Sequence, residues 1–218
     1  MDRDWAVIYE FVFDRLRAVR QDMVIQSLAN LDTVYILEEL RNRPISVFDP
    51  TINNTHLQEV IKQLLVQYDA VPPGGTKAMH QNRTEFESIY LLFNLNHNEA
   101  LYHFLSLPSD IRKQEVCERA WQINMAAIDH NYVRLFRLLN QLSLLEYSAV
   151  HRHVLPLQCN TLRRMNTAYS SKACKFSLSE LCAMIGHTSS QDTTSLLVSH
   201  GVKVTDGCVS FLKSSWRE

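Results

Sequence analysis

Apolar residues recur at steps of three and four along most of this chain, a pattern that predicts amphipathic helices. Prolines mark where helices are expected to end, and we expect Pro156 to separate the last two. Thr55 and Thr84 each begin a capping box, so two helices should open there, with a loop over 45–54 before the first. The predicted helices cover 5–29, 31–40, a run from Thr55, a run from Thr84, 98–107, 110–129, 132–142, 144–155 and 157–170.

Short helices joined by short loops pack as antiparallel pairs. Residues 1–160 are therefore expected to form a stack of antiparallel helical hairpins. The clearest linker is 71–83, which contains two prolines followed by two glycines. No fixed sequence period is present, so the pattern does not indicate a regular repeat array.

The pattern changes after Ser171, and residues 161–218 are expected to form a second domain. It reads, in order, as a strand, two helices and a β-hairpin, which is the arrangement of a winged helix following a helical segment. The fold class predicted for the whole chain is mainly α, with helical hairpins followed by a C-terminal winged helix. The expected elements are a strand within 173–176, a helix capped by Ser177, a helix over 191–199 ended by His200-Gly201, and a hairpin over 202–212 around Asp206-Gly207.

Composition supports a helical, globular protein. The 218 residues are 46% hydrophobic with a net charge of -1, which argues against intrinsic disorder, and the 5 Gly and 6 Pro are few for a sandwich or barrel. The 5 Cys are odd in number and irregularly spaced, so we expect reduced packing residues rather than a disulfide framework. Neither a run of about 18 apolar residues nor a secretory leader is apparent, so we expect no membrane span and no secretion.

Motifs that would indicate catalysis are not apparent. We find no Gly-rich phosphate loop, nucleophile elbow, zincin helix or paired-cysteine zinc signature, and we predict no enzyme activity, cofactor, metal or small-molecule substrate. His151 and His153 would point away from each other on a helix and so would not chelate one metal. Cys182 is interpreted as a core residue. The Cys and His side chains of the last domain do not have zinc-knuckle spacing; they are Cys174, Cys182, His187 and His200.

Charge is divided unevenly along the chain. Residues 160–218 hold seven basic and four acidic groups, a net of +3, and the remainder carries -4. A basic winged helix could contact RNA or DNA phosphates. The expected recognition helix, however, contains Asp192 and no Arg or Lys, which disfavours sequence-specific readout and favours a protein-binding winged helix. The candidate phosphate contacts are Arg163, Arg164, Lys203, Lys213 and Arg217.

Three segments carry a family resemblance. They are FDRLRAVRQD with the preceding Phe11-Val12, FESIYLLFNL at 86–95, and NYVRLFRL at 131–138. Together with the Phe48-Asp49-Pro50 loop and the expected winged helix, they resemble the suppressor-of-actin/GANP domain family over nearly the whole chain. The variant at Leu16-Arg17-Ala18 looks most like the short member of the family that carries little beyond this domain and is linked to the centrosome and spindle.

This resemblance implies a non-enzymatic, PCI-like scaffold of nuclear messenger-RNA export or of centrosome duplication and spindle organisation. It also implies a PCI-domain partner, a small acidic subunit, and a location in nucleus and cytoplasm or at the centrosome and spindle. Arg134 and Arg137, three residues apart on one helical face, are the partner-binding candidates, with an intramolecular ion pair as the alternative. The charged residues of the first motif are interpreted as a structural network rather than a binding site; they are Asp14, Arg15, Arg17, Arg20 and Asp22.

Two departures from the family pattern affect the expected boundaries. Members have further helices before FDRLRAVRQD, and their second helix usually continues for several turns where this chain has Arg41-Asn42-Arg43. Both differences would expose apolar surface that neighbouring helices normally cover. We therefore expect the helical part to be N-terminally incomplete, as in a truncated or alternatively spliced product.

Overall fold

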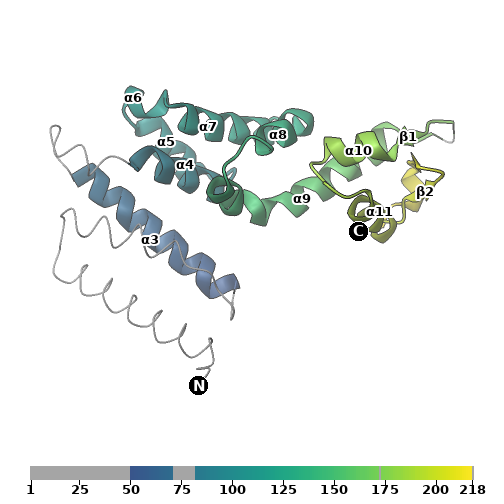
Figure 1. The fold of residues 1–218 in the computed structure, drawn as a ribbon, viewed down its shortest axis with the longest axis horizontal. Helices are drawn as coiled ribbons and strands as arrows, with labels where there is room; N and C mark the ends of the chain where they lie inside the picture. The colour runs from purple at the N-terminus through teal and green to yellow at the C-terminus, as the bar shows by residue number, and fades with distance from the viewer. Residues whose placement is uncertain (1–49, 71–81, 172, 218) are drawn as a thin grey trace, which may run out of the picture. The chain divides into compact units, whose positions relative to one another are not determined.

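The computed structural model describes residues 50–70, 82–171 and 173–217, which belong to two units, Met1–Tyr90 and Leu91–Glu218. Most of the described chain is helical (Figure 1). The elements are α3 Pro50–Ala70, α4 Arg83–Phe93, α5 Asn98–Ser106, α6 Ser109–Arg112, α7 Glu115–Ile128, α8 Tyr132–Leu139, α9 Leu144–Ala168, β1 Phe176–Ser177, α10 Leu178–Met184, α11 Ser190–Ser199, β2 Lys203–Thr205, β3 Cys208–Ser210 and the 3₁₀ turn η2 Lys213–Ser215.

In the first unit, α3 buries a stripe at helical spacing, made of Ile61, Leu64, Leu65 and Tyr68. Leu57, four residues before Ile61 on the same face, is partly exposed. The expected loop over 45–54 is wrong at its end, because α3 begins at Pro50. Proline suits the first position of a helix, where no amide hydrogen bond is needed.

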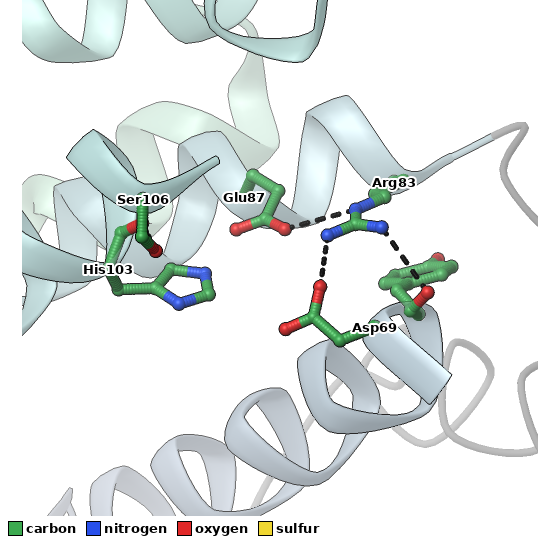
Figure 2. A network of polar contacts seen from close by, with 6 residues as sticks. Asp69, Arg83, Glu87, His103 and Ser106 are labelled. Carbon is green, nitrogen blue, oxygen red and sulfur yellow. Dashed lines mark hydrogen bonds and ion pairs between the residues drawn. The ribbon is translucent and has the colours of Figure 1, made fainter. Parts of the chain in front are cut away.

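A buried ion pair lies where α4 begins. The Arg83 guanidinium donates to Glu87 Oε1 over 3.2 Å and to the Tyr68 carbonyl over 3.2 Å. Both charged residues are buried, with 7% exposure for Arg83 and 1% for Glu87. Asp69, which is more exposed, also pairs with the guanidinium, as Figure 2 shows. Because α4 starts at Arg83, Thr84 lies inside its first turn, and the predicted start is one residue late.

In the second unit, α7 packs on α8, and α8 packs on α9 and α10. Asn124 of α7 is fully buried and uses its amide in three hydrogen bonds. It donates to the carbonyls of Leu91 and Ala120, and it accepts from the amide of Asn96, whose φ is 63°. A left-handed Asn is thereby held at the turn before α5.

The single helix expected over 110–129 is wrong, because α6 and α7 are separate. Gln114 between them has extended backbone, and its side-chain amide donates to the carbonyl of Asp110 over 3.3 Å. This bond satisfies a carbonyl at the end of α6 that a continuous helix would have used.

The predicted break at Pro156 is also wrong, because α9 continues through it to Ala168. Proline removes one amide donor, which leaves the carbonyl of Arg152 without its helical partner. Arg152 and Pro156 both lie on the exposed side of the helix. On the other side of the helix, Val154 and Leu157 are buried, and their packing holds the helix on both sides of the proline. The expected division at residue 160 falls inside this helix, and the two-domain boundary stays a prediction.

After α9, the chain forms a three-stranded antiparallel sheet of order β1-β3-β2 with α10 and α11 between β1 and β2. Ser177 Oγ accepts from the amide of Glu180, which confirms the predicted cap of α10. The hairpin turn is confirmed too, since Asp206 and Gly207 have φ of 51° and 69°. Element order and turn thus match the sequence pattern (Figure 1), while assignment of the module as a PCI-like winged helix stays a prediction.

Candidate interaction surface

Helix α8 presents two arginines on the side opposite its buried face. Leu135 and Phe136 are buried, whereas Arg134 and Arg137 are exposed. Asn131 Oδ1 accepts from the amide of Arg134 over 3.2 Å and so caps the helix. The 3.6-residue period of this short helix therefore places both guanidinium groups on its outer face.

The alternative role for these arginines is an intramolecular ion pair. Across the described ranges, neither Arg134 nor Arg137 lies within 4.0 Å of a carboxylate. Arg119, by contrast, forms an ion pair with Glu115 along α7. The described residues therefore offer these two arginines no ion pair, and their role in binding a partner stays a prediction.

The candidate phosphate contacts of the last module gather at the base of its hairpin. In the hairpin register Lys203 lies opposite Ser210, and Lys213 follows Ser210 by three residues. Both lysines therefore lie at the end of the hairpin away from its turn. The amide of Arg217 donates to the carbonyl of His200 over 2.9 Å, which brings the chain end to the same place. All three basic residues are exposed, although no contact joins their side chains in the described part of the molecule.

His200 connects this base to α9, a link that the sequence reading did not identify. Its ring stacks on Trp216 with centroids 4.5 Å apart, and its Nδ1 lies 2.9 Å from the carbonyl oxygen of Arg217. Its Nε2 lies 3.4 Å from Cys159 Sγ. Because a carbonyl only accepts, Nδ1 carries the proton and Nε2 accepts from the thiol. Burial raises the pKa of Cys159, which favours the protonated thiol in this contact.

The two arginines of α9 point to different neighbours. Arg163 lies one turn after Cys159 and donates to Asn160 over 3.4 Å, so it lies on the helical face that reaches His200. The guanidinium of Arg164 instead lies 5.7 Å from the ring centroid of Tyr132 on α8. The structure therefore places Arg163 near the hairpin base and Arg164 beside α8.

Helix α11, the expected recognition helix, has an outer face without cations, which includes the exposed Val198. Ser189 Oγ accepts from the amides of Gln191 and Asp192 and caps α11, which begins one residue earlier than predicted. Gln191, Asp192 and Ser195 are exposed. Such a face offers amide and hydroxyl groups but no positive charge to a phosphate backbone.

Several predicted residues lie outside this surface. The motif residues Asp14, Arg15, Arg17, Arg20 and Asp22 lie outside the described residues. Among residues 50–70, 82–171 and 173–217, no three His, Cys, Asp or Glu side chains are grouped as a metal site requires. No helix in those ranges is both long and apolar enough to cross a membrane.

Two partly buried histidines make the second unit sensitive to acid. Burial lowers the pKa of His153, against the opposing effect of its hydrogen bond to the Phe93 carbonyl, and Arg152 lowers it further. Burial also lowers the pKa of His187, and the nearby Asp192 carboxylate partly offsets this lowering. The Nδ1 atom of His187 lies 2.9 Å from Thr193 Oγ1.

We therefore expect the free energy of unfolding to fall as the pH drops below about 6.5, the ordinary histidine pKa. In that window the unfolded chain binds more protons than the folded chain, so stability decreases with acidification. Denaturant unfolding at about pH 7.5 and about pH 5.5 measures the difference. The double variant His153→Gln/His187→Gln should show a smaller difference, and an unchanged difference would contradict this assignment.

The chain is similar to known proteins over most of its length. The family model described as the SAC3/GANP family matches residues 1–206. The chain is 25% identical over 220 residues to Protein xmas of Drosophila melanogaster, covering 93% of this chain and 10% of that protein. It is 22% identical over 221 residues to SAC3 family protein B of Arabidopsis thaliana, covering 90% of this chain and 13% of that protein. It is 26% identical over 132 residues to SAC3 family protein A of the same plant, covering 60% of this chain and 12% of that protein. The chain thus spans roughly a tenth of the length of these relatives.

Proposed function

This chain belongs to the SAC3/GANP family, and on that premise we propose that it is a non-enzymatic scaffold of nuclear messenger-RNA export. The observation that carries the proposal is the family match over residues 1–206. A PCI-type protein and a small acidic subunit are the proposed partners, and a role in centrosome duplication and spindle organisation is proposed beside export. The module after α9, which we interpret as a PCI-like winged helix, is proposed to take part in that pairing together with α8.

The exposed face of α8 supports a scaffold role because its cations are not used inside the described molecule. Arg134 and Arg137 face outward while their helix is anchored by Leu135, Phe136 and Leu139. Exposed arginines that can form bidentate pairs are common at protein interfaces. We assign them to the contact with the PCI-type partner.

Replacing both arginines tests this assignment. We expect Arg134→Glu/Arg137→Glu in the full chain to weaken association with a PCI-domain partner by roughly tenfold or more, because two attractive charges become repulsive. The measurement is quantitative co-purification of the tagged chain from cells. Lys113→Glu, at an exposed position after α6, is the matched control and should leave recovery unchanged.

Two results would contradict these proposals, the first for the scaffold role and the second for the contact at α8. One is co-purification that recovers neither PCI-domain nor centrosomal proteins with the wild-type chain. The other is equal recovery by the double variant and the control, which would remove α8 from the interface. Imaging the tagged chain through the cell cycle separates the two roles, since export predicts a nuclear signal and spindle organisation predicts a centrosomal one.

Direct binding of RNA or DNA is the alternative, and the clustering of Lys203, Lys213 and Arg217 at the hairpin base is what supports it. The absence of Arg and Lys from α11 makes it the weaker candidate. A salt titration tests it, because phosphate contacts require affinity to fall steeply with ionic strength, by roughly one logarithmic unit per logarithmic unit of salt for each contact. Affinity that is insensitive to salt would exclude it.

A further inference from the structure

Helix α9 joins the helical group, which runs from the end of α4 to α8, to the last module. The first half of α9 is held by the helical group at Phe93. His153 Nε2 lies 2.9 Å from the carbonyl oxygen of Phe93, and the guanidinium of Arg152 lies 4.8 Å from the centroid of the Phe93 ring. These contacts fix the part of α9 that precedes Pro156 on the helical group.

The second half of α9 is held by the last module instead. Gln158 is buried, and its Nε2 donates to the carbonyl of Ile185 at the end of α10 over 3.0 Å. The next residue, Cys159, contacts His200 at the end of α11. Residues 154–157 therefore separate the hydrogen bonds that α9 makes with the helical group from those that it makes with the module.

Proline lies between these two sets of contacts. Because Pro156 has no amide hydrogen, the carbonyl of Arg152 lacks its helical partner, and one hydrogen bond of the ladder is missing at this turn. Sharp bends in long helices occur mostly at such residues. Helix α9 is therefore most easily bent where its contacts change from the helical group to the last module.

Helix α8 of the helical group also packs on α10 of the module (Figure 1). Gly186 follows α10 with a φ of +72°, and a Cβ there would lie 3.3 Å from Phe136 Cδ1 and 3.9 Å from Asn140 Oδ1. The missing side chain lets the Phe136 ring approach the backbone. We call these three residues the α8–α10 latch. Such packing loses roughly a quarter to a half of its attraction when the gap widens by about 0.5–1 Å, so a small displacement opens the latch.

We propose that α9 is a hinged arm, on which the last module turns about Pro156, and that the α8–α10 latch holds the module in the position described here. The inference rests on the scaffold function proposed above and adds a means of regulating it. With the latch closed, a partner can contact α8 and the module together. A bend of about 20° moves a point about 20 Å beyond the hinge by about 7 Å, which separates the two surfaces by more than an ion pair can span.

The test measures the position of the module in the full chain. Spin labels are attached to p-acetylphenylalanine placed at Lys113 on the helical group and at Thr205 on the hairpin, both of which are exposed. Electron paramagnetic resonance then gives the distribution of distances between them. We expect Gly186→Asn to raise the share of a second distance at least about fivefold, because Asn accepts the left-handed backbone while its side chain displaces Phe136.

Two further variants separate hinge motion from local damage. Gly207→Asn makes the same substitution at a φ of +69° where nothing lies within 4 Å of the added Cβ, and it should leave the distances unchanged. Pro156→Ala restores the amide that bonds to Arg152 and stiffens α9. Added to Gly186→Asn, it should return the distribution toward that of the wild type, which it could not do if Gly186→Asn had only unfolded the module.

The link to the partner is tested by co-purification. Gly186→Asn should recover the PCI-type partner several-fold less well than Gly207→Asn, because α8 and the module no longer face the partner together. Equal recovery by these two variants would overturn the regulatory role. Unchanged distances in Gly186→Asn, or no reversal by Pro156→Ala, would overturn the hinge itself. A wild-type chain that recovers no PCI-type partner would contradict the scaffold proposal, while the distances, measured on the chain alone, would still decide whether the hinge exists.

Discussion

Arg83→Met is expected to lower the free energy of unfolding of the α3–α4 unit by about 3 kcal/mol, because it removes the cation that is paired with a buried carboxylate. Glu87 is 1% exposed and receives the Arg83 guanidinium over 3.2 Å. The same guanidinium holds the carbonyl of Tyr68 at the end of α3 (Figure 2). Loss of one side chain therefore removes both the ion pair within α4 and the bond to α3. Equilibrium denaturation of the full chain, followed by circular dichroism, measures the change.

Two further variants separate this ion pair from a general effect of charge. Asp69→Asn removes the exposed member of the cluster and should cost no more than about 1 kcal/mol, as for other solvent-exposed pairs. Arg83→Met/Glu87→Leu removes both buried charges and should be more stable than Arg83→Met alone. A double variant no more stable than the single one, or a loss for Arg83→Met below about 1 kcal/mol, would show that the buried pair is not what stabilises this unit.

Gly201→Ala is expected to destabilise the last module by about 2–3 kcal/mol and to free the chain end from α11. Gly201 has a φ of +76°, which costs an L-residue about 1–2 kcal/mol. A Cβ there would lie 2.2 Å from the carbonyl oxygen of Ser215, so the tail would have to move. The stacking of Trp216 on His200 and the bonds between His200 and Arg217 would be lost with it.

Gly207→Ala provides a matched control for that substitution. Gly207 has a φ of +69°, but nothing lies within 4 Å of the Cβ that alanine would add. It should therefore show the backbone cost alone, about 1–2 kcal/mol, and leave the tail in place. Trypsin cleavage after Lys213, followed by mass spectrometry, should be faster in Gly201→Ala than in Gly207→Ala. Equal stability and equal cleavage in the two variants would contradict a role for the Gly201–Ser215 contact.

Local signals in the sequence predicted much of the secondary structure. The Ser177 cap and the Asp206-Gly207 turn are confirmed because both depend on residues adjacent in the chain. The stripe of Ile61, Leu64 and Tyr68 follows from helical period alone. The helix break predicted at Pro156 is wrong because the cost of a proline inside a helix can be offset by packing on both sides of it and by water at the freed carbonyl.

The residues of the candidate site could be predicted only in part from local sequence signals. Composition placed an excess of basic residues after residue 160, and the hairpin register then brought Lys203 and Lys213 to one end. The contact between Cys159 and His200 joins positions 41 residues apart, and no local pattern specifies it. The exposure of Leu144 and Leu155 on α9 is likewise not predictable from the helical pattern, because it depends on which elements pack beside the helix.

The sequence by itself determined the helical class of this protein and the order of strands and helices after α9. It also determined the family and the uneven distribution of charge. Each of these depends on residue type and short-range spacing. Tertiary structure decided which side chains remain exposed or become paired. Arg83 is buried against Glu87, while Arg134, Arg152 and Arg163 face outward, although all four are arginines on helices. The difference arises because burial of a charge depends on which distant element packs against it, and a carboxylate must be there to offset the loss of water.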